Sequence, residues 1–166
     1  EQKSREYVLQ VFDDPAVEAG SKVLMMGVYA NTISTNKSKK ISDPELESFS
    51  VELFRRLEAN YPADADVHLI GGDLFMTLEK DQEALEHYSK AVKGGSSSFD
   101  AWQNLMFLES EANQIDSLIK HSEEALELFP NQAMAWYFNG YGNLLKKKYR
   151  EGTYALEQAK KLSAVN

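Results

Sequence analysis

The two tryptophans of this chain, Trp102 and Trp136, lie 34 residues apart, and Ala91, Ala125 and Ala159 follow one another at the same interval. An interval of this length is typical of a helix-turn-helix unit that is repeated along a chain and stacked on its own copies. Such a stack buries apolar side chains between neighbouring units and presents a broad surface instead of a deep cleft. The spacing therefore predicts an all-α repeat protein, and it favours binding over catalysis.

Apolar residues at helical spacing predict a pair of antiparallel helices in each of the last three units. In the first of these units Ile70, Leu74 and Phe75 form the apolar face of the first helix. Gly95 ends the second helix of that unit, and Pro130 ends the second helix of the next. The expected helices cover about residues 66–78 and 82–93, 100–110 and 116–128, and 133–145 and 149–162.

Small and aromatic residues hold one register through these units, and we interpret them as framework. They are Gly72, Ala84, Tyr88 and Ala91 in residues 65–98, Trp102, Ala125 and Pro130 in residues 99–132, and Trp136, Gly140 and Ala159 in residues 133–166. The pattern resembles the tetratricopeptide repeat (TPR) family. The resemblance implies a right-handed α-solenoid of antiparallel helix pairs, forming one domain overall. The last unit is expected to be terminal, because Thr153 and Lys160 stand where the first unit has Leu85 and Val92.

A degenerate unit is expected upstream, in residues 16–64, because Val23 and Gly27 repeat the four-residue spacing of His68 and Gly72. Its helices would cover about residues 16–30 and 44–60. Val23 and His68 lie 45 residues apart, which is 11 more than one repeat, and we assign the surplus to a loop at about residues 31–42. This loop is either a tolerated insertion or a lysine-bearing contact for an acidic partner. Residues 1–15 would form an N-terminal helix, either a cap or the remnant of a preceding repeat.

The resemblance also implies that the first helix of each unit lines a concave groove. Such a mixed, partly aromatic surface suits an extended or helical segment with apolar anchors. Capture of a C-terminal carboxylate is disfavoured, because Asp73 would repel it. The candidate groove comprises Leu69, Asp73, Met76, Gln103, Phe107, Ser110, Tyr137, Tyr141 and Leu144.

The net charge of −8 argues against a nucleic-acid partner, since neutralising phosphates requires clustered Lys and Arg. The charge is also unevenly distributed. Residues 99–132 hold seven acidic residues and one lysine, whereas residues 133–166 hold six basic and two acidic residues. This reversal between neighbouring units would either steer a dipolar partner or only reflect solvated helix faces.

No pattern of catalytic or metal-ligating residues is evident. His68, His87 and His121 lack HExxH-like spacing, and the last two occupy equivalent outer positions one repeat apart. We therefore expect surface histidines, no metal site and no cofactor. Adjacent carboxylates such as Glu123 and Glu124 are expected on exposed helix faces, where nothing separates their pKa values. The absence of cysteine excludes disulfides and thiolate metal sites.

The sequence thus predicts a scaffold that binds a protein or peptide noncovalently and is not an enzyme. The alternative is a structural or self-association module of a longer multidomain protein. No apolar run approaches the ~18 residues of a membrane span, so direct membrane insertion is not expected. The chain does not begin with Met and has no signal-peptide pattern, which leaves a cytoplasmic and a periplasmic location both open.

Overall fold

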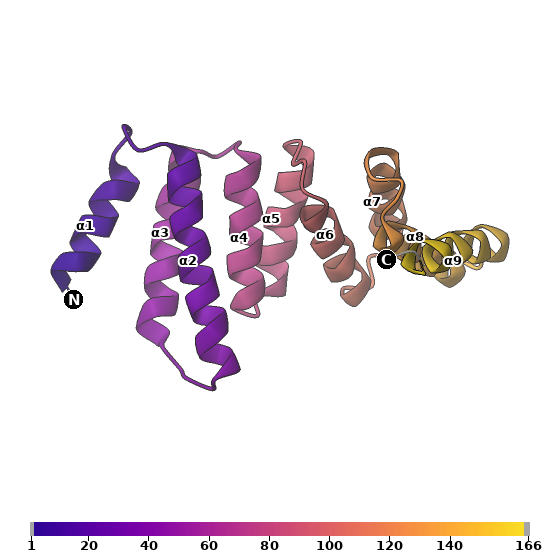
Figure 1. The fold of residues 1–166 in the computed structure, drawn as a ribbon, viewed down its shortest axis with the longest axis horizontal. Coiled ribbons are helices and arrows are strands. Elements are labelled where there is room, and N and C mark those ends of the chain that lie inside the picture. The colour runs from indigo at the N-terminus through magenta and orange to yellow at the C-terminus, as the bar shows by residue number, and fades with distance from the viewer. Residues whose placement is uncertain (1, 165–166) are drawn as a thin grey trace. The chain divides into compact units, whose positions relative to one another are not determined.

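The computed structural model describes residues 2–164, and this part of the chain contains nine α-helices and no strand (Figure 1). The helices form two compact units, Glu1–Ser96 and Ser97–Asn166. Each unit has its own buried apolar side chains. No helix within residues 2–164 combines the length and the apolar character that crossing a membrane requires.

The N-terminal unit consists of α1 (Gln2–Asp13), α2 (Ala19–Ser38), α3 (Pro44–Asn60), α4 (Ala65–Thr77) and α5 (Asp81–Lys93). Short connections make α2 and α3, and then α4 and α5, antiparallel neighbours (Figure 1). In addition, α1 packs on α3, and α2 packs on α4. Fully buried Phe12, Met26, Leu53, Phe54 and Tyr88 fill the space between these helices.

The predicted loop at residues 31–42 is wrong for most of its length. Helix α2 continues to Ser38, and only residues 39–43 connect it to α3. Ala30 and Ile33 are buried on the inner face of α2, so apolar contacts continue past the expected helix end. Asp43 then begins α3 by accepting a hydrogen bond from the Leu46 amide at 3.0 Å. The surplus residues therefore lengthen the first helix of this pair.

The turns inside the helix pairs repeat one backbone geometry. Glu79, Asn113 and Lys147 lie 34 residues apart and have φ values of 59°, 55° and 60°. Lys40, between α2 and α3, has a φ of 57°. At all four turns the next amide donates to the carbonyl five residues before it, at 2.8 to 2.9 Å, which closes the helix in a Schellman motif. The sequence period is thus also a period of the backbone.

The C-terminal unit consists of α6 (Phe99–Glu111), α7 (Ile115–Leu128), α8 (Ala133–Leu145) and α9 (Tyr149–Ser163). Helix α7 packs on α6 and α8, and α8 packs on α9. Contacts between α6 and α8 complete the unit. Its buried side chains include Ala101, Leu105, Met106, Leu118 and Ala155.

Two glycines allow close approach within the helix pairs. A Cβ at Gly72 would lie 2.6 Å from the buried ring of Tyr88. A Cβ at Gly140 would lie 2.7 Å from Leu156 Cγ and 3.0 Å from the Gly152 carbonyl oxygen. Real Cβ atoms essentially never approach to such distances. Helix α4 can therefore pack against α5, and α8 against α9, only because glycine has no side chain at these two positions.

Candidate functional site

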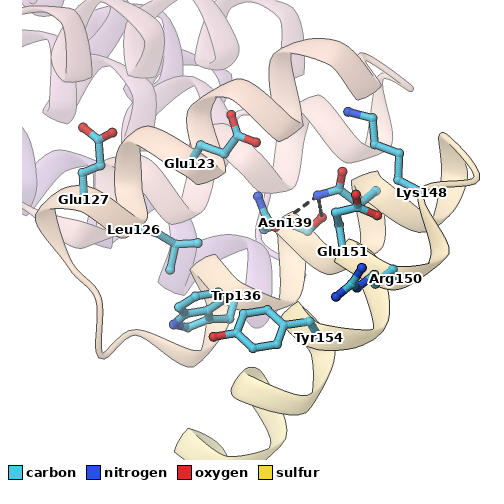
Figure 2. A pocket seen from close by; sticks show the side chains of 10 residues that line it. Glu123, Leu126, Glu127, Trp136, Asn139, Lys148, Arg150, Glu151 and Tyr154 are labelled. Carbon is cyan, nitrogen blue, oxygen red and sulfur yellow. Dashed lines mark hydrogen bonds between the residues drawn. The ribbon is translucent and has the colours of Figure 1, made fainter.

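A hollow of about 810 Å³ opens between α7, α8 and α9 of the C-terminal unit (Figure 2). We refer to it as the α7–α9 hollow. Its lining combines apolar, amide, acidic and basic side chains, which is the mixture expected of a recognition site. The lining residues are Glu123, Leu126, Glu127, Trp136, Asn139, Asn143, Lys148, Arg150, Glu151 and Tyr154.

Aromatic side chains form the apolar part of the α7–α9 hollow. The rings of Trp136 and Tyr154 meet edge to face, with centroids 6.0 Å apart and an interplanar angle of 78° (Figure 2). The indole N–H of Trp136 donates to the Pro130 carbonyl at 2.9 Å, which fixes the ring. Tyr154 is 57% exposed. The two rings therefore offer a partner a large apolar contact surface. Little side-chain entropy is lost when these side chains become ordered on binding.

Two buried amides lie on α8 at the base of the α7–α9 hollow. Asn139 Nδ2 donates to Ser122 Oγ at 3.0 Å. Asn143 Nδ2 donates to the backbone carbonyl and to the side-chain oxygen of Asn139, at 3.0 and 3.1 Å. These bonds fix both carboxamides, each of which carries donors and an acceptor that can also bind a peptide backbone.

Charged side chains of both signs surround the α7–α9 hollow, and Glu151 lies beside Lys148 and Arg150 at the start of α9. Glu123 and Glu127 project from α7, whereas Lys148 and Arg150 lie at the start of α9 (Figure 2). Within residues 2–164 no ion pair engages any of these four side chains. Unpaired charges of opposite sign create a local dipole that can orient a charged partner.

The candidate groove residues of this unit form a different surface. Phe107, Tyr137 and Tyr141 are 47%, 44% and 37% exposed on α6 and α8. The rings of Tyr137 and Tyr141 are nearly parallel, with centroids 6.3 Å apart. Leu144 instead contacts α9, where a Cβ at position 152 would meet it at 2.7 Å. The remaining members, Gln103 and Ser110, are half-buried on α6.

The other three members of the candidate groove lie on α4 in the N-terminal unit, where all are half-buried. Leu69 and Asp73 line a hollow of about 400 Å³ together with residues of α2, whereas Met76 does not. The Asp73 carboxylate accepts a hydrogen bond from the Tyr88 hydroxyl at 2.7 Å. The nine residues are therefore divided between the two units, and a groove that is continuous across them stays a prediction.

None of the nine candidate groove residues lines the α7–α9 hollow. The sequence predicts Trp136 to be framework. In the structure its indole N–H donates to the Pro130 carbonyl, and its side chain also lines this hollow. The reversal of charge between residues 99–132 and 133–166 is the sequence signal that points to it, because Glu123 and Glu127 come from one segment and Lys148 and Arg150 from the other.

The prediction of surface histidines is wrong. His68, His87 and His121 are only 4%, 2% and 9% exposed. His121 Nδ1 lies 2.6 Å from Oε1 of Glu109, which is itself 2% exposed. Each ring finds a polar partner inside its unit, and this partner offsets the cost of burying it. The repeat register correctly makes His87 and His121 equivalent, but their positions face neighbouring helices.

His68 and His87 face each other, together with Glu58, in the N-terminal unit. His68 Nδ1 lies 3.2 Å from His87 Nδ1, which in turn lies 3.9 Å from Glu58 Oε1. One ligand atom from each of the three residues lies within 4.8 Å of those of the other two. The repeat register relates His87 to His121, but the two histidines that the fold brings together are His68 and His87.

Burial and neighbouring charges together determine the ionisation of His87 and Glu58. Desolvation lowers the pKa of His87 to about 4, although the carboxylate of Glu58 opposes the shift. Burial alone would raise the pKa of Glu58, but the hydrogen bond from Arg55, with His87 and Lys90 nearby, holds it below its ordinary value. At neutral pH the ring of His87 is therefore neutral, and the Glu58 carboxylate is charged.

The antiparallel helix pairs, their repeated turns and their close-packed glycines define a TPR-like helical repeat fold. Solved structures with a similar fold include MamA from MSR-1, with 18% identity and a TM-score of 0.67 over 98% of this chain and 87% of that one. MamA from AMB-1 has 17% identity and a TM-score of 0.72 over 98% of this chain and 82% of that one.

PilF of Pseudomonas aeruginosa has 18% identity and a TM-score of 0.60 over 86% of this chain and 63% of that one. Identities this low establish a shared fold and nothing about ligands. No protein-family model matches the sequence, and no curated protein matches it either.

Proposed function

We propose that this chain is a noncovalent protein-binding module whose C-terminal unit binds a peptide segment in the α7–α9 hollow. The observation that carries the proposal is the pair of half-buried Trp136 and exposed Tyr154, flanked by unpaired charges of opposite sign. Aromatic rings at the centre of a concave surface are the usual anchors of protein interfaces. The TPR-like fold supports a binding role in general terms.

The lining of the hollow defines the chemistry of the bound segment. An aliphatic or aromatic side chain would rest on Trp136 and Tyr154, and the peptide backbone would exchange hydrogen bonds with the amide of Asn139. Basic residues of the segment would face Glu123, and acidic residues would face Arg150. The proposed partner is therefore an extended, amphoteric segment with one apolar anchor.

The exposed faces of α6 and α8 form a second candidate surface. The aromatic rings of Phe107, Tyr137 and Tyr141 are exposed to solvent, and the rings of the two tyrosines stack on each other. This surface is the part of the candidate groove that belongs to the C-terminal unit. It would bind a segment through aromatic contacts without the charged side chains that surround the α7–α9 hollow.

Peptides selected from a random displayed library distinguish the two surfaces. The dissociation constant of a selected, labelled peptide is measured by fluorescence anisotropy against the chain and its variants. We expect Tyr154→Ala to weaken binding by roughly 30-fold, as for a hot-spot aromatic, and Arg150→Glu to weaken binding of an acidic peptide. Tyr149→Ala is the matched control, because Tyr149 is 64% exposed on the same helix but does not line the hollow.

Loss of binding in the Tyr137→Ala, Tyr141→Ala double variant, with Tyr154→Ala unaffected, would move the site to the α6 and α8 surface. A library that yields no specific peptide would contradict peptide binding altogether. Sedimentation at increasing protein concentration tests the structural alternative. A dimer that Tyr154→Ala dissociates would show that the hollow serves self-association.

A further inference from the structure

Glu58, His68 and His87 converge from three different helices of the N-terminal unit. Glu58 lies on α3, His68 on α4 and His87 on α5, and α4 packs on both α3 and α5. Figure 1 shows α4 beside α5. Their potential ligand atoms lie within 4.8 Å of one another, although the residues are up to 29 positions apart in sequence. Two imidazoles and one carboxylate form a common ligand set for catalytic and regulatory zinc.

The orientation of His68 is fixed by its outer hydrogen bond. Its Nε2 lies 2.9 Å from the Pro62 carbonyl oxygen, which can only accept, so Nε2 carries the proton. The lone pair of Nδ1 is therefore directed towards His87. A backbone carbonyl that orients a histidine in this way is the usual outer-shell partner of a metal ligand.

The ring of His87 is held by aromatic neighbours. It stacks on Phe75 at 5.3 Å with an interplanar angle of 9°, and it meets the edge of Phe54 at 4.9 Å. Gly71 completes this packing, because a Cβ there would collide with Phe54 and approach His87 Cγ to 3.3 Å. His87 Nδ1 is thus held in place opposite His68 Nδ1.

The distances fit a tetrahedral ion. Two nitrogens bound to zinc at 2.0–2.1 Å lie about 3.3 Å apart, and the two Nδ1 atoms lie 3.2 Å apart. Glu58 Oε1 lies 3.9 Å from His87 Nδ1, and the ligand atoms of all three residues lie within 4.8 Å of one another, so the carboxylate needs to move inward to meet the same geometry. The Glu58 side chain is 19% exposed, so an ion can enter and a water can fill the fourth position.

We propose that Glu58 Oε1, His68 Nδ1 and His87 Nδ1 bind one Zn²⁺ ion. On binding, the proton of His87 moves from Nδ1 to Nε2, so that both Nδ1 lone pairs face the ion. The hydrogen bond between the two rings is replaced by two metal–nitrogen bonds. The ion would link α3, α4 and α5 and stabilise the N-terminal unit by mass action.

Two cations next to Glu58 modulate the site. Arg55 donates to Glu58 Oε2 at 2.9 Å and leaves Oε1 facing the histidines. Lys90 Nζ lies 3.5 Å from Oε1 and competes with an incoming ion for the same oxygen. Removal of the Lys90 charge should therefore tighten zinc binding, whereas it would not affect a zinc site elsewhere on the chain.

Calorimetric titration of zinc chloride into the full chain, freed of metal with a chelator, tests the proposal. We expect one Zn²⁺ per chain. Loss of an outer-shell partner alone costs 10–100-fold in affinity, so His68→Gln, His87→Gln and Glu58→Gln should each weaken binding by at least about 100-fold. Lys90→Met should tighten it several-fold at low salt. Glu52→Gln, on the exposed side of α3, is the matched control and should bind as the unaltered chain does.

Circular dichroism establishes that each variant is folded, and cobalt(II) provides an independent readout through the intense visible absorption of tetrahedral coordination. Failure of the unaltered chain to bind zinc would overturn the proposal. Equal affinity in the three ligand variants would also overturn it, because it would assign the ion to other surface groups. An unchanged affinity in Lys90→Met would contradict coordination by Glu58 Oε1.

Discussion

Glu109 and His121 show how a single interaction decides the placement of a polar residue. They lie 12 positions apart on α6 and α7, and their side chains meet at 2.6 Å inside the C-terminal unit. The sequence leaves His121 on an outer face and carries no sign that Glu109 is buried. Neither residue, taken alone in the sequence, indicates that it is buried. Each polar side chain is buried together with the other, which is its hydrogen-bond partner.

This pair yields a prediction about stability. His121→Leu should lower the free energy of unfolding by roughly 3–5 kcal/mol, because it leaves a buried carboxylate without its partner. The double variant Glu109→Leu, His121→Leu should recover much of this loss, since it removes the buried acidic group as well. Urea denaturation monitored by circular dichroism measures both changes. A double variant that is less stable than His121→Leu would contradict this account.

Gly72 yields a second prediction at the scale of a residue. Gly72→Ala should destabilise the N-terminal unit by about 1–3 kcal/mol, because the new methyl group meets the Tyr88 ring in a filled core. Gly27, on the preceding first helix, is the matched control, since a Cβ there has only Ile70 Cδ1 within reach, at 4.0 Å. Thermal unfolding should show a lower midpoint for Gly72→Ala and an unchanged or higher one for Gly27→Ala.

At the scale of helices, the sequence predicts the regular part of the chain well. The expected helices in residues 66–162 correspond to α4 through α9, because apolar periodicity, glycines and Pro130 mark them locally. Helix α2 is the exception. Its polar stretch after Ala30 resembles a loop in composition, yet the buried side chain of Ile33 keeps it helical through contacts that only the folded unit provides.

The ends of helices yield a third prediction. Gly95 has a φ of 84° and no neighbour within 4 Å of a would-be Cβ, so backbone strain alone opposes a side chain there. Gly95→Ala should cost about 1 kcal/mol. Gly20, inside α2, also has open space around it, and Gly20→Ala should instead stabilise the chain by about 0.5 kcal/mol through helix propensity. Equal changes in urea midpoint for the two variants would contradict the role of the turn geometry.

At the scale of the whole molecule, the class of fold is predictable from the 34-residue period, whereas the surfaces are not. The α7–α9 hollow combines residues from one helix pair with residues from the next, so no single repeat contains it. The same is true of Glu58, His68 and His87, which come from three helices. A repeat pattern identifies equivalent positions, but it does not state which side chains from neighbouring repeats meet.

The central claim is that a peptide occupies the α7–α9 hollow against Trp136, and one fluorescence measurement tests it most directly. The chain has two tryptophans, and Trp102 is buried, so Trp102→Phe leaves Trp136 as the only indole reporter. Titration with a library-selected peptide should change the Trp136 emission and saturate at the affinity found by anisotropy. Tyr154→Ala should remove the change, and Tyr149→Ala should retain it. Full peptide binding with unchanged Trp136 emission would contradict the claim.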